Sequence, residues 1–123
     1  MSKAKILIVD DDARLSTLMR AILVRGGYET REENRSFAAL TAAREFRPDL
    51  ILLDVDMPGK DGGTVAAELR MDPTLARTPI IFVTSLVGKG ESGMRGGERF
   101  LAKPVIPADL LVAVGQVLPK LAA

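Results

Sequence analysis

Short runs of consecutive apolar residues alternate along the chain with longer segments whose apolar residues recur at helical spacing. The clearest runs are residues 6–9, 50–53 and 80–83, and weaker ones lie at 28–32 and 100–102. Consecutive rather than alternating apolar positions are typical of strands that are buried on both faces of a parallel sheet. We therefore expect these runs to form the short strands of one parallel sheet.

The segment after the first run has the pattern of an amphipathic helix. Leu15, Met19 and Ile22 recur at helical intervals, and Gly26 follows them as a stop signal. Asp12 stands just before this segment, where the N-terminus of a helix favours an acidic cap. We expect Asp12 to cap the helix or face solvent rather than bind a ligand.

Three further segments favour helices for similar reasons. Ser36 is placed to cap a second helix, and Pro48 prevents that helix from continuing into the next strand. Leu69 belongs to a third helix, and Pro107 suits the first position of a last helix. The alternation predicts one α/β domain over residues 1–123: a single doubly wound, flavodoxin-like fold with a five-stranded parallel sheet flanked by helices.

One segment departs from this alternation. Five of the ten residues from Gly88 to Gly97 are glycine, and each interior glycine costs a helix about 1 kcal/mol relative to alanine. We predict that the fourth of five helices, between the last two strands, is short or irregular and that this segment has raised mobility.

Composition removes several kinds of chemistry. The 123 residues contain neither Cys nor His, which excludes disulfides, zinc fingers, thiol nucleophiles and histidine-based triads.

Seventeen basic residues against sixteen acidic ones give a net charge of +1, and neither sign forms a long block. We therefore expect no direct binding of nucleic acid. The N-terminal residues resemble neither a signal peptide nor a membrane span, so we expect a cytoplasmic protein without a membrane partner.

Acidic residues follow two of the predicted strands. Asp10 and Asp11 come directly after the first strand, and Asp54 ends the third. Because ligands of doubly wound sheets bind beyond the carboxyl ends of the strands, these side chains should share one site. Crowded carboxylates either raise a pKa or recruit a divalent cation, and oxygen ligands without His or Cys favour Mg²⁺.

Two more polar residues fall at strand ends. Thr84 follows the fourth apolar run, and Lys103 follows the last. An aspartate becomes a nucleophile for a phosphoryl group when a metal and a cation offset the developing charge. A metal together with Lys103 meets that requirement, with the Thr84 hydroxyl as a further hydrogen-bond donor.

In these positions the chain resembles the response-regulator receiver domain of two-component signalling, of the chemotaxis-regulator type, over essentially its whole length. Four stretches in order carry the resemblance: Ile8-Val9-Asp10-Asp11, Leu53-Asp54-Val55-Asp56-Met57-Pro58-Gly59-Lys60-Asp61-Gly62, Val83-Thr84-Ser85 and Phe100-Leu101-Ala102-Lys103-Pro104.

The resemblance implies a phospho-acceptor and a metal site. Asp54 would accept the phosphoryl group. The carboxylates of Asp11 and Asp54 and the backbone carbonyl of Asp56 would bind Mg²⁺, and Asp10 would support the ion through water.

The resemblance also implies a switch. Thr84 and Lys103 would bind phosphoryl oxygens, and Phe100 would repack once Thr84 is drawn inward, by packing alone because Phe has no hydroxyl. The Lys103-Pro104 peptide bond would be cis, which a proline makes feasible.

The resemblance implies a phosphorelay switch that is no enzyme beyond its own phosphoryl transfer and dephosphorylation. Its partners would be a histidine kinase or phosphotransfer protein, and a downstream target or a second copy of the chain. The glycine-rich segment lies where this family usually transmits its signal, so the usual surface could be altered, or the segment could become ordered on phosphorylation.

Two alternative functions remain open at this stage. Asp54-Val55-Asp56 also resembles the nucleophile motif of small Mg²⁺-dependent haloacid-dehalogenase-like phosphohydrolases. In that family the motif follows the first strand, whereas in this chain it follows the third. The other alternative is a receiver-like binding module that is never phosphorylated.

Overall fold

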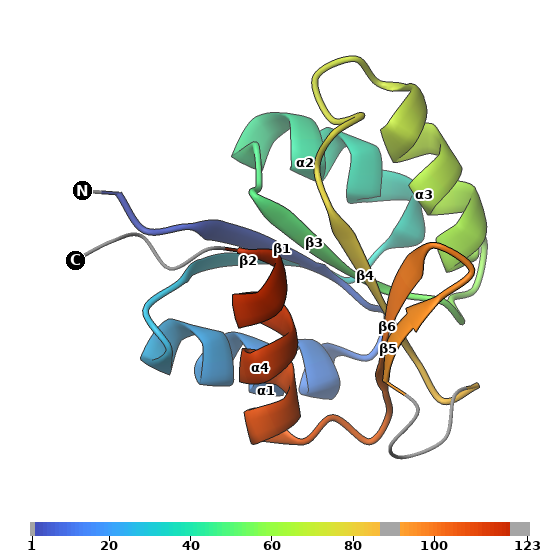
Figure 1. The fold of residues 1–123 in the computed structure, drawn as a ribbon. Coiled ribbons are helices and arrows are strands. Elements are labelled where there is room, and N and C mark those ends of the chain that lie inside the picture. Colours follow the sequence, from blue (N-terminus) through green and yellow to red (C-terminus); the bar gives the residue numbers. More distant parts are fainter. Residues whose placement is uncertain (1, 87–91, 119–123) are drawn as a thin grey trace.

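Residues 2–86 and 92–118 are described by the computed structural model of this protein (Figure 1). The strands are β1 (Lys5–Val9), β2 (Glu29–Glu33), β3 (Leu50–Asp54), β4 (Ile80–Thr84), β5 (Gly93–Arg95) and β6 (Glu98–Ala102). The helices are α1 (Ala13–Arg25), α2 (Ala39–Phe46), α3 (Gly62–Met71) and α4 (Pro107–Val117), with a 3-10 turn, η1 (Ser36–Ala38), before α2. In the described part of the chain no helix has the length and hydropathy to cross a membrane.

The strands form one sheet in the order β2-β1-β3-β4-β6-β5, and the first five in this order run parallel. Helices α2 and α3 cover one face and α1 and α4 the other (Figure 1). Neighbouring residues of a strand enter opposite cores: Leu7 and Leu53 face α2 and α3, whereas Ile8 and Leu52 face α1 and α4. Burial on both faces explains the consecutive apolar runs and confirms the doubly wound prediction.

The prediction of five strands is wrong by one strand. The five predicted strands are present and parallel, but β5 pairs antiparallel with β6 at the edge of the sheet. The residues between them, Gly96 and Gly97, have φ angles of 56° and 81°. Positive φ at both central positions is typical of the two-residue turn that joins antiparallel strands, and glycine adopts it without steric cost.

The expected fourth helix is therefore replaced, within the described residues, by a strand. Residues 92–98 form the start of this hairpin rather than a helix. Residues 87–91, where the predicted irregular helix and raised mobility would begin, lie outside the described residues. The last helix predicted from the sequence is α4, and Pro107 is its first residue as expected.

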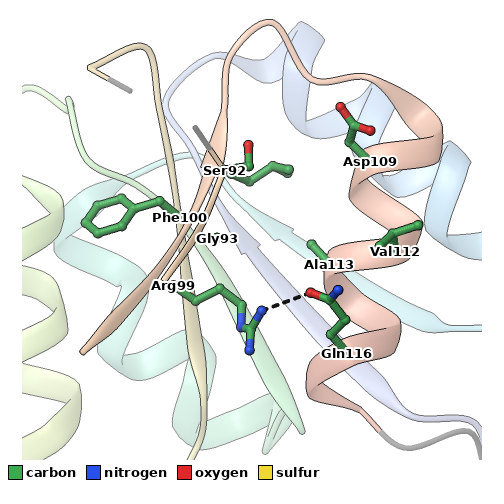
Figure 2. A pocket seen from close by; sticks show the side chains of 9 residues that line it. Ser92, Gly93, Arg99, Phe100, Asp109, Val112, Ala113 and Gln116 are labelled. Carbon is green, nitrogen blue, oxygen red and sulfur yellow. Dashed lines mark hydrogen bonds between the residues drawn. The ribbon is translucent and has the colours of Figure 1, made fainter. Parts of the chain in front are cut away.

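An ion pair and a hydrogen bond fix the first residues of β6, next to the turn of the hairpin, to both helical layers. Arg70 of α3 makes a bidentate contact with Glu98, with distances of 2.7 and 2.8 Å between nitrogen and oxygen. On the other face, Arg99 donates to the Gln116 side chain of α4 at 3.0 Å, beside a pocket between β6 and α4 (Figure 2). The glycine-rich segment is thus integrated into the fold at its C-terminal end.

Two Gly-to-Ala changes, one in the turn and one in α4, should have opposite effects on the free energy of unfolding. Gly97→Ala should lower the free energy of unfolding by about 1–2 kcal/mol, because a Cβ is strained in the left-handed region. Gly115→Ala, in the middle of α4 with open space around the new methyl group, should raise it by about 0.5–1 kcal/mol. Urea unfolding of both variants measures this, and a Gly97→Ala protein as stable as wild type would contradict the turn.

Candidate functional site

The carboxyl ends of four neighbouring parallel strands bring together polar residues that lie far apart in the sequence. Asp10 follows β1, Asp54 ends β3, Thr84 ends β4 and Lys103 follows β6. The pairing register matches these ends residue for residue, with Asp54 beside Val83 and Thr84 beside Ala102. The sheet edge predicted from the sequence to hold the site therefore exists.

Three carboxylates meet at this edge. Asp10, Asp11 and Asp54 each contribute an oxygen, and these oxygens lie within 4.8 Å of one another. Asp10 and Asp54 are 0% and 2% exposed, whereas Asp11 is exposed. One buried oxygen, Oδ2 of Asp10, has no hydrogen-bond partner among residues 2–86 and 92–118. An oxygen-only donor set with an unsatisfied carboxylate oxygen and one side open to solvent fits a hard divalent cation.

Lys103 supplies the positive charge inside this cluster. Its Nζ donates to Oδ1 of Asp54 at 3.0 Å and lies 3.6 Å from Oδ2 of Asp10. The longer contact exceeds hydrogen-bond distance, so Asp10 gains charge compensation without a hydrogen bond. Burial acts to lower the pKa of Lys103, but the hydrogen bond to Asp54 and the charges of Asp10 and Asp54 outweigh it and raise the pKa. Lys103 is therefore a permanent cation at neutral pH.

Burial and mutual repulsion raise the pKa values of two of the acids, which favours their neutral forms. Burial raises the pKa of Asp10 from 3.8 to about 6, and the charge of Asp54 adds to the effect, while the hydrogen bond from the Asp12 backbone opposes it. Burial and the proximity of Asp54 also raise the pKa of Asp11. The metal-free site is thus short of positive charge, as expected for a site that takes up a cation.

Local backbone contacts hold the loop after β1. The backbone N–H of Asp12 donates to Oδ1 of Asp10 at 2.9 Å. The Asp12 carboxylate itself accepts from the N–H groups of Arg14 and Leu15 at 3.0 and 3.2 Å and caps α1. The prediction that Asp12 is a cap is confirmed.

The loop after β3 is shaped by a close approach of α3. A Cβ at Gly62 would lie 2.5 Å from the backbone oxygen of Asp54, so only glycine lets α3 begin against the strand end. The backbone N–H of Asp56 donates to Oδ1 of Asp54 at 3.2 Å, and the Asp56 side chain is exposed. Asp54 therefore receives two donors, one from Lys103 and one from its own loop.

Thr84 ends β4 at the same edge of the sheet as the acid cluster. Thr84 is 2% exposed, and its hydroxyl accepts from the N–H of Leu86 at 3.0 Å. Its backbone oxygen accepts from the N–H of Lys103 at 2.9 Å, which ties the two residues together. The Lys103-Pro104 bond that follows is cis, as the resemblance implied.

The Phe100 ring is part of the core rather than of the acid cluster. It stacks on Phe82 with ring centroids 5.5 Å apart and 29° between the planes. It packs on the α2 and α3 side of the sheet, and Figure 2 shows it across β6 from Gln116 of α4. A change in the position of Phe100 would therefore have to alter this stack.

Two supporting contacts, made by Asn34 and Ser36, were not predicted from the sequence. The side-chain amide of Asn34 donates to the backbone oxygen of Asp10 at 2.8 Å and to the Ser16 hydroxyl at 2.9 Å. Ser36, predicted to cap a helix, makes no side-chain cap of α2 and instead contacts the loop after β3. The sequence does show that both are polar residues that follow β2. The carboxyl end of β2 lies at the same edge of the sheet as the acid cluster, so their positions could have indicated contact with the site.

Comparison with known proteins identifies the family. The profile of the response regulator receiver domain matches residues 6–115. The Polar-differentiation response regulator DivK of Brucella anthropi is 38% identical over 103 residues, which cover 81% of this chain and 84% of that protein. The Response regulator PleD of Caulobacter vibrioides is 41% identical over 114 residues, 90% of this chain and 25% of that protein.

Solved structures agree with this assignment. The chemotaxis response regulator CheY4 of Vibrio cholerae matches with a TM-score of 0.84 at 32% identity, over 95% of this chain and 100% of that one. The receiver domain of the sensor histidine kinase PA1611 from Pseudomonas aeruginosa matches with a TM-score of 0.79 at 30% identity, over 94% and 97%, and was solved with magnesium coordinated in its active site cleft.

The chain belongs to the response regulator receiver domain family and is a phosphorylation-dependent signalling switch. The chain spans 25% of the length of PleD. It is 35% identical to the DNA-binding response regulator MtrA of Mycobacterium leprae and spans 50% of the length of that protein. These matches do not favour the phosphohydrolase alternative, whose motif would follow β1 rather than β3.

The raised pKa of Asp10 predicts how stability depends on pH in metal-free protein. The folded-state pKa of about 6 exceeds the usual value of 3.8, so the contribution of Asp10 to stability becomes more favourable as pH falls from 7 to 4. Asp10→Asn should raise the free energy of unfolding at pH 7 by about 1–3 kcal/mol and lose this advantage near pH 4. Urea unfolding with a chelator measures both, and an equal gain at the two pH values would contradict the assignment.

Proposed function

We propose that this chain accepts a phosphoryl group on the carboxylate of Asp54 in an Mg²⁺-dependent reaction. The observation that carries the proposal is the contact of Lys103 Nζ with Asp54 Oδ1 at 3.0 Å, inside a cluster of three carboxylates. A cation and a metal on either side of a carboxylate allow it to approach a phosphoryl group that is itself negative.

The proposed metal ligands are the carboxylates of Asp11 and Asp54 and the backbone carbonyl of Asp56, with Asp10 supporting the ion through water. The oxygen of Asp10 that lacks a hydrogen-bond partner is suited to accept from such a water. When bound, Mg²⁺ would neutralise part of the charge on the carboxylates and on the transferring phosphoryl group.

In the proposed transfer, a carboxylate oxygen of Asp54 forms the new bond to phosphorus. The bond from phosphorus to the histidine nitrogen of the donor breaks, and its electron pair stays with the imidazole. Lys103 binds one phosphoryl oxygen and Thr84 donates its hydroxyl to another. Chemistry in this chain is limited to its own phosphoryl transfer and dephosphorylation.

The proposed response begins at Thr84. Its hydroxyl is held by the N–H of Leu86, and binding a phosphoryl oxygen would turn it toward Asp54. Phe100 would then repack against Phe82 and shift the equilibrium between two conformations of the domain. This role of Phe100 uses packing alone, because the ring has no hydrogen-bonding group.

The proposed partners are proteins. A histidine kinase or a phosphotransfer protein would donate the phosphoryl group, and a downstream target or a second copy of the chain would read the result. We propose a cytoplasmic protein whose receiver domain makes no direct contact with nucleic acid or membrane, consistent with its balance of 17 basic and 16 acidic residues.

The proposal predicts a single phosphorylation that depends on Asp54. Incubation with Mg²⁺ and a small phosphodonor such as acetyl phosphate should add one phosphoryl group, seen by intact mass, and Asp54→Ala or a chelator should abolish it. No added group, or one that survives Asp54→Ala, would contradict the mechanism and favour the binding module. Continuous turnover of phosphate esters that depends on Asp54 would favour a phosphohydrolase instead.

Lys103 should affect metal binding and phosphoryl transfer in opposite directions. Lys103→Met removes a cation that competes with Mg²⁺ for Asp54 and Asp10, so Mg²⁺ affinity should rise several-fold. The rate of phosphorylation at saturating Mg²⁺ should fall by about 100-fold, because the cation that offsets negative charge on the transferring group is lost. Calorimetric titration and single-turnover rates measure the two effects, and parallel losses of both would sink the assigned role.

A further inference from the structure

One short segment contacts both of the loops that carry the acids. Residues 34–37, here called the β2–α2 connector, run from the end of β2 into η1. At one end, Asn34 donates to the backbone oxygen of Asp10 at 2.8 Å. At the other end, Ser36 contacts the loop of residues 55–61 that follows Asp54. The connector therefore spans the two halves of the proposed metal site.

Ser36 both donates and accepts a hydrogen bond on that loop. Its hydroxyl donates to the backbone oxygen of Pro58 at 3.0 Å and accepts from the N–H of Lys60 at 3.2 Å. The residue is only 6% exposed. A buried hydroxyl that bridges two backbone groups two residues apart fixes the turn between them, because breaking either bond would leave a buried polar group unpaired.

Phe37 makes a second contact with the same turn. Gly59, between the two backbone groups held by Ser36, has a φ of 85°. A Cβ built on Gly59 would lie 2.4 Å from Cζ of Phe37, so the ring lies directly over the glycine. The ring is 69% exposed, and its contact with Gly59 gives this otherwise exposed side chain a structural role.

The Asn34 end of the connector is anchored on rigid elements. The Asn34 amide also donates to the hydroxyl of Ser16 in α1 at 2.9 Å, and that hydroxyl donates to Glu32 in β2 at 2.8 Å. Ser16 is 0% exposed. Helix α1 and strand β2 thus determine where the connector begins, and the backbone of Asp10 is held to the same point.

We propose that the β2–α2 connector is a positioning element of the metal site, in which Asn34 and Ser36 hold the Asp10–Asp11 loop and the Asp54–Asp56 segment at the separation that Mg²⁺ requires. This inference rests on the proposed function. The ion demands near-ideal octahedral geometry at short distances, while the three carboxylates repel one another before it binds. Contacts that resist this repulsion raise Mg²⁺ affinity although they do not touch the ion.

Removal of either contact tests the proposal by Mg²⁺ binding alone. In calorimetric titrations of the full chain without phosphodonor, Asn34→Ala and Ser36→Ala should each weaken Mg²⁺ binding by about 10-fold. Ser36→Thr keeps the hydroxyl and should restore most of the affinity. The double variant should bind Mg²⁺ only slightly more weakly than the single variant with the lower Mg²⁺ affinity, because releasing either end already frees the two loops.

Kinetics separate positioning from a general loss of structure. With a small phosphodonor, the Mg²⁺ concentration that gives half the maximal rate should rise by the same factor as the dissociation constant. The rate at saturating Mg²⁺ should stay within about 3-fold of wild type, because the ion itself then restores the geometry. Phe37→Ala, a change at an exposed side chain that leaves the fold intact, should weaken Mg²⁺ binding by about 2–3-fold.

Thr74→Ala is the matched control. Thr74 donates its hydroxyl to Asp72 at 2.6 Å in the turn after α3, so its loss should lower stability in urea without changing the Mg²⁺ midpoint. Unchanged Mg²⁺ affinity in folded Asn34→Ala, Ser36→Ala and Phe37→Ala would overturn the inference. A wild-type protein that binds no Mg²⁺ and accepts no phosphoryl group would instead overturn the proposed function.

Discussion

The rest of the structure depends on the electrostatic compensation of two buried carboxylates by one ammonium group. Asp10 and Asp54 are 0% and 2% exposed, and Lys103 lies 3.6 and 3.0 Å from their oxygens. Buried charges of one sign are tolerated only with such a partner. In the described part of the chain, one cation for three clustered carboxylates leaves the site negative, which is why it fits a metal. Burial and the charge of Asp54 raise the pKa of Asp10.

The parallel sheet makes this arrangement possible. Asp54 and Lys103 are separated by 49 positions in the sequence, yet the strand order places β4 alone between β3 and β6. Apolar residues on both faces pack against two layers of helices, so β3 and β4 are buried along their whole length, including Asp54 and Thr84 at their carboxyl ends. The same burial that stabilises the domain therefore raises the pKa of Asp10.

The hairpin of β5 and β6 changes the surface through which such a domain would signal. Receiver domains of the resembled type commonly use a helix before the last parallel strand, and the described residues have β5 there instead. Phe100 joins β6 to the core through its stack on Phe82, and the neighbouring Glu98 and Arg99 reach α3 and α4. The second strand of the hairpin thus contacts both helical layers.

The sequence by itself determined the parallel strands, all the helices except the one expected between the last two parallel strands, and the meeting of Asp10, Asp11, Asp54 and Lys103. Consecutive apolar runs indicate parallel strands, and the carboxyl ends of parallel strands share one edge of the sheet. Only the tertiary structure decided the remaining features. Gly96 and Gly97 read as helix breakers, and their role as a turn depends on β6 being available to pair. Ser36 reads as a local cap, but its hydroxyl bonds to Pro58 and Lys60, more than twenty residues away. A local pattern does not specify which distant backbone group a hydroxyl or an edge strand will meet.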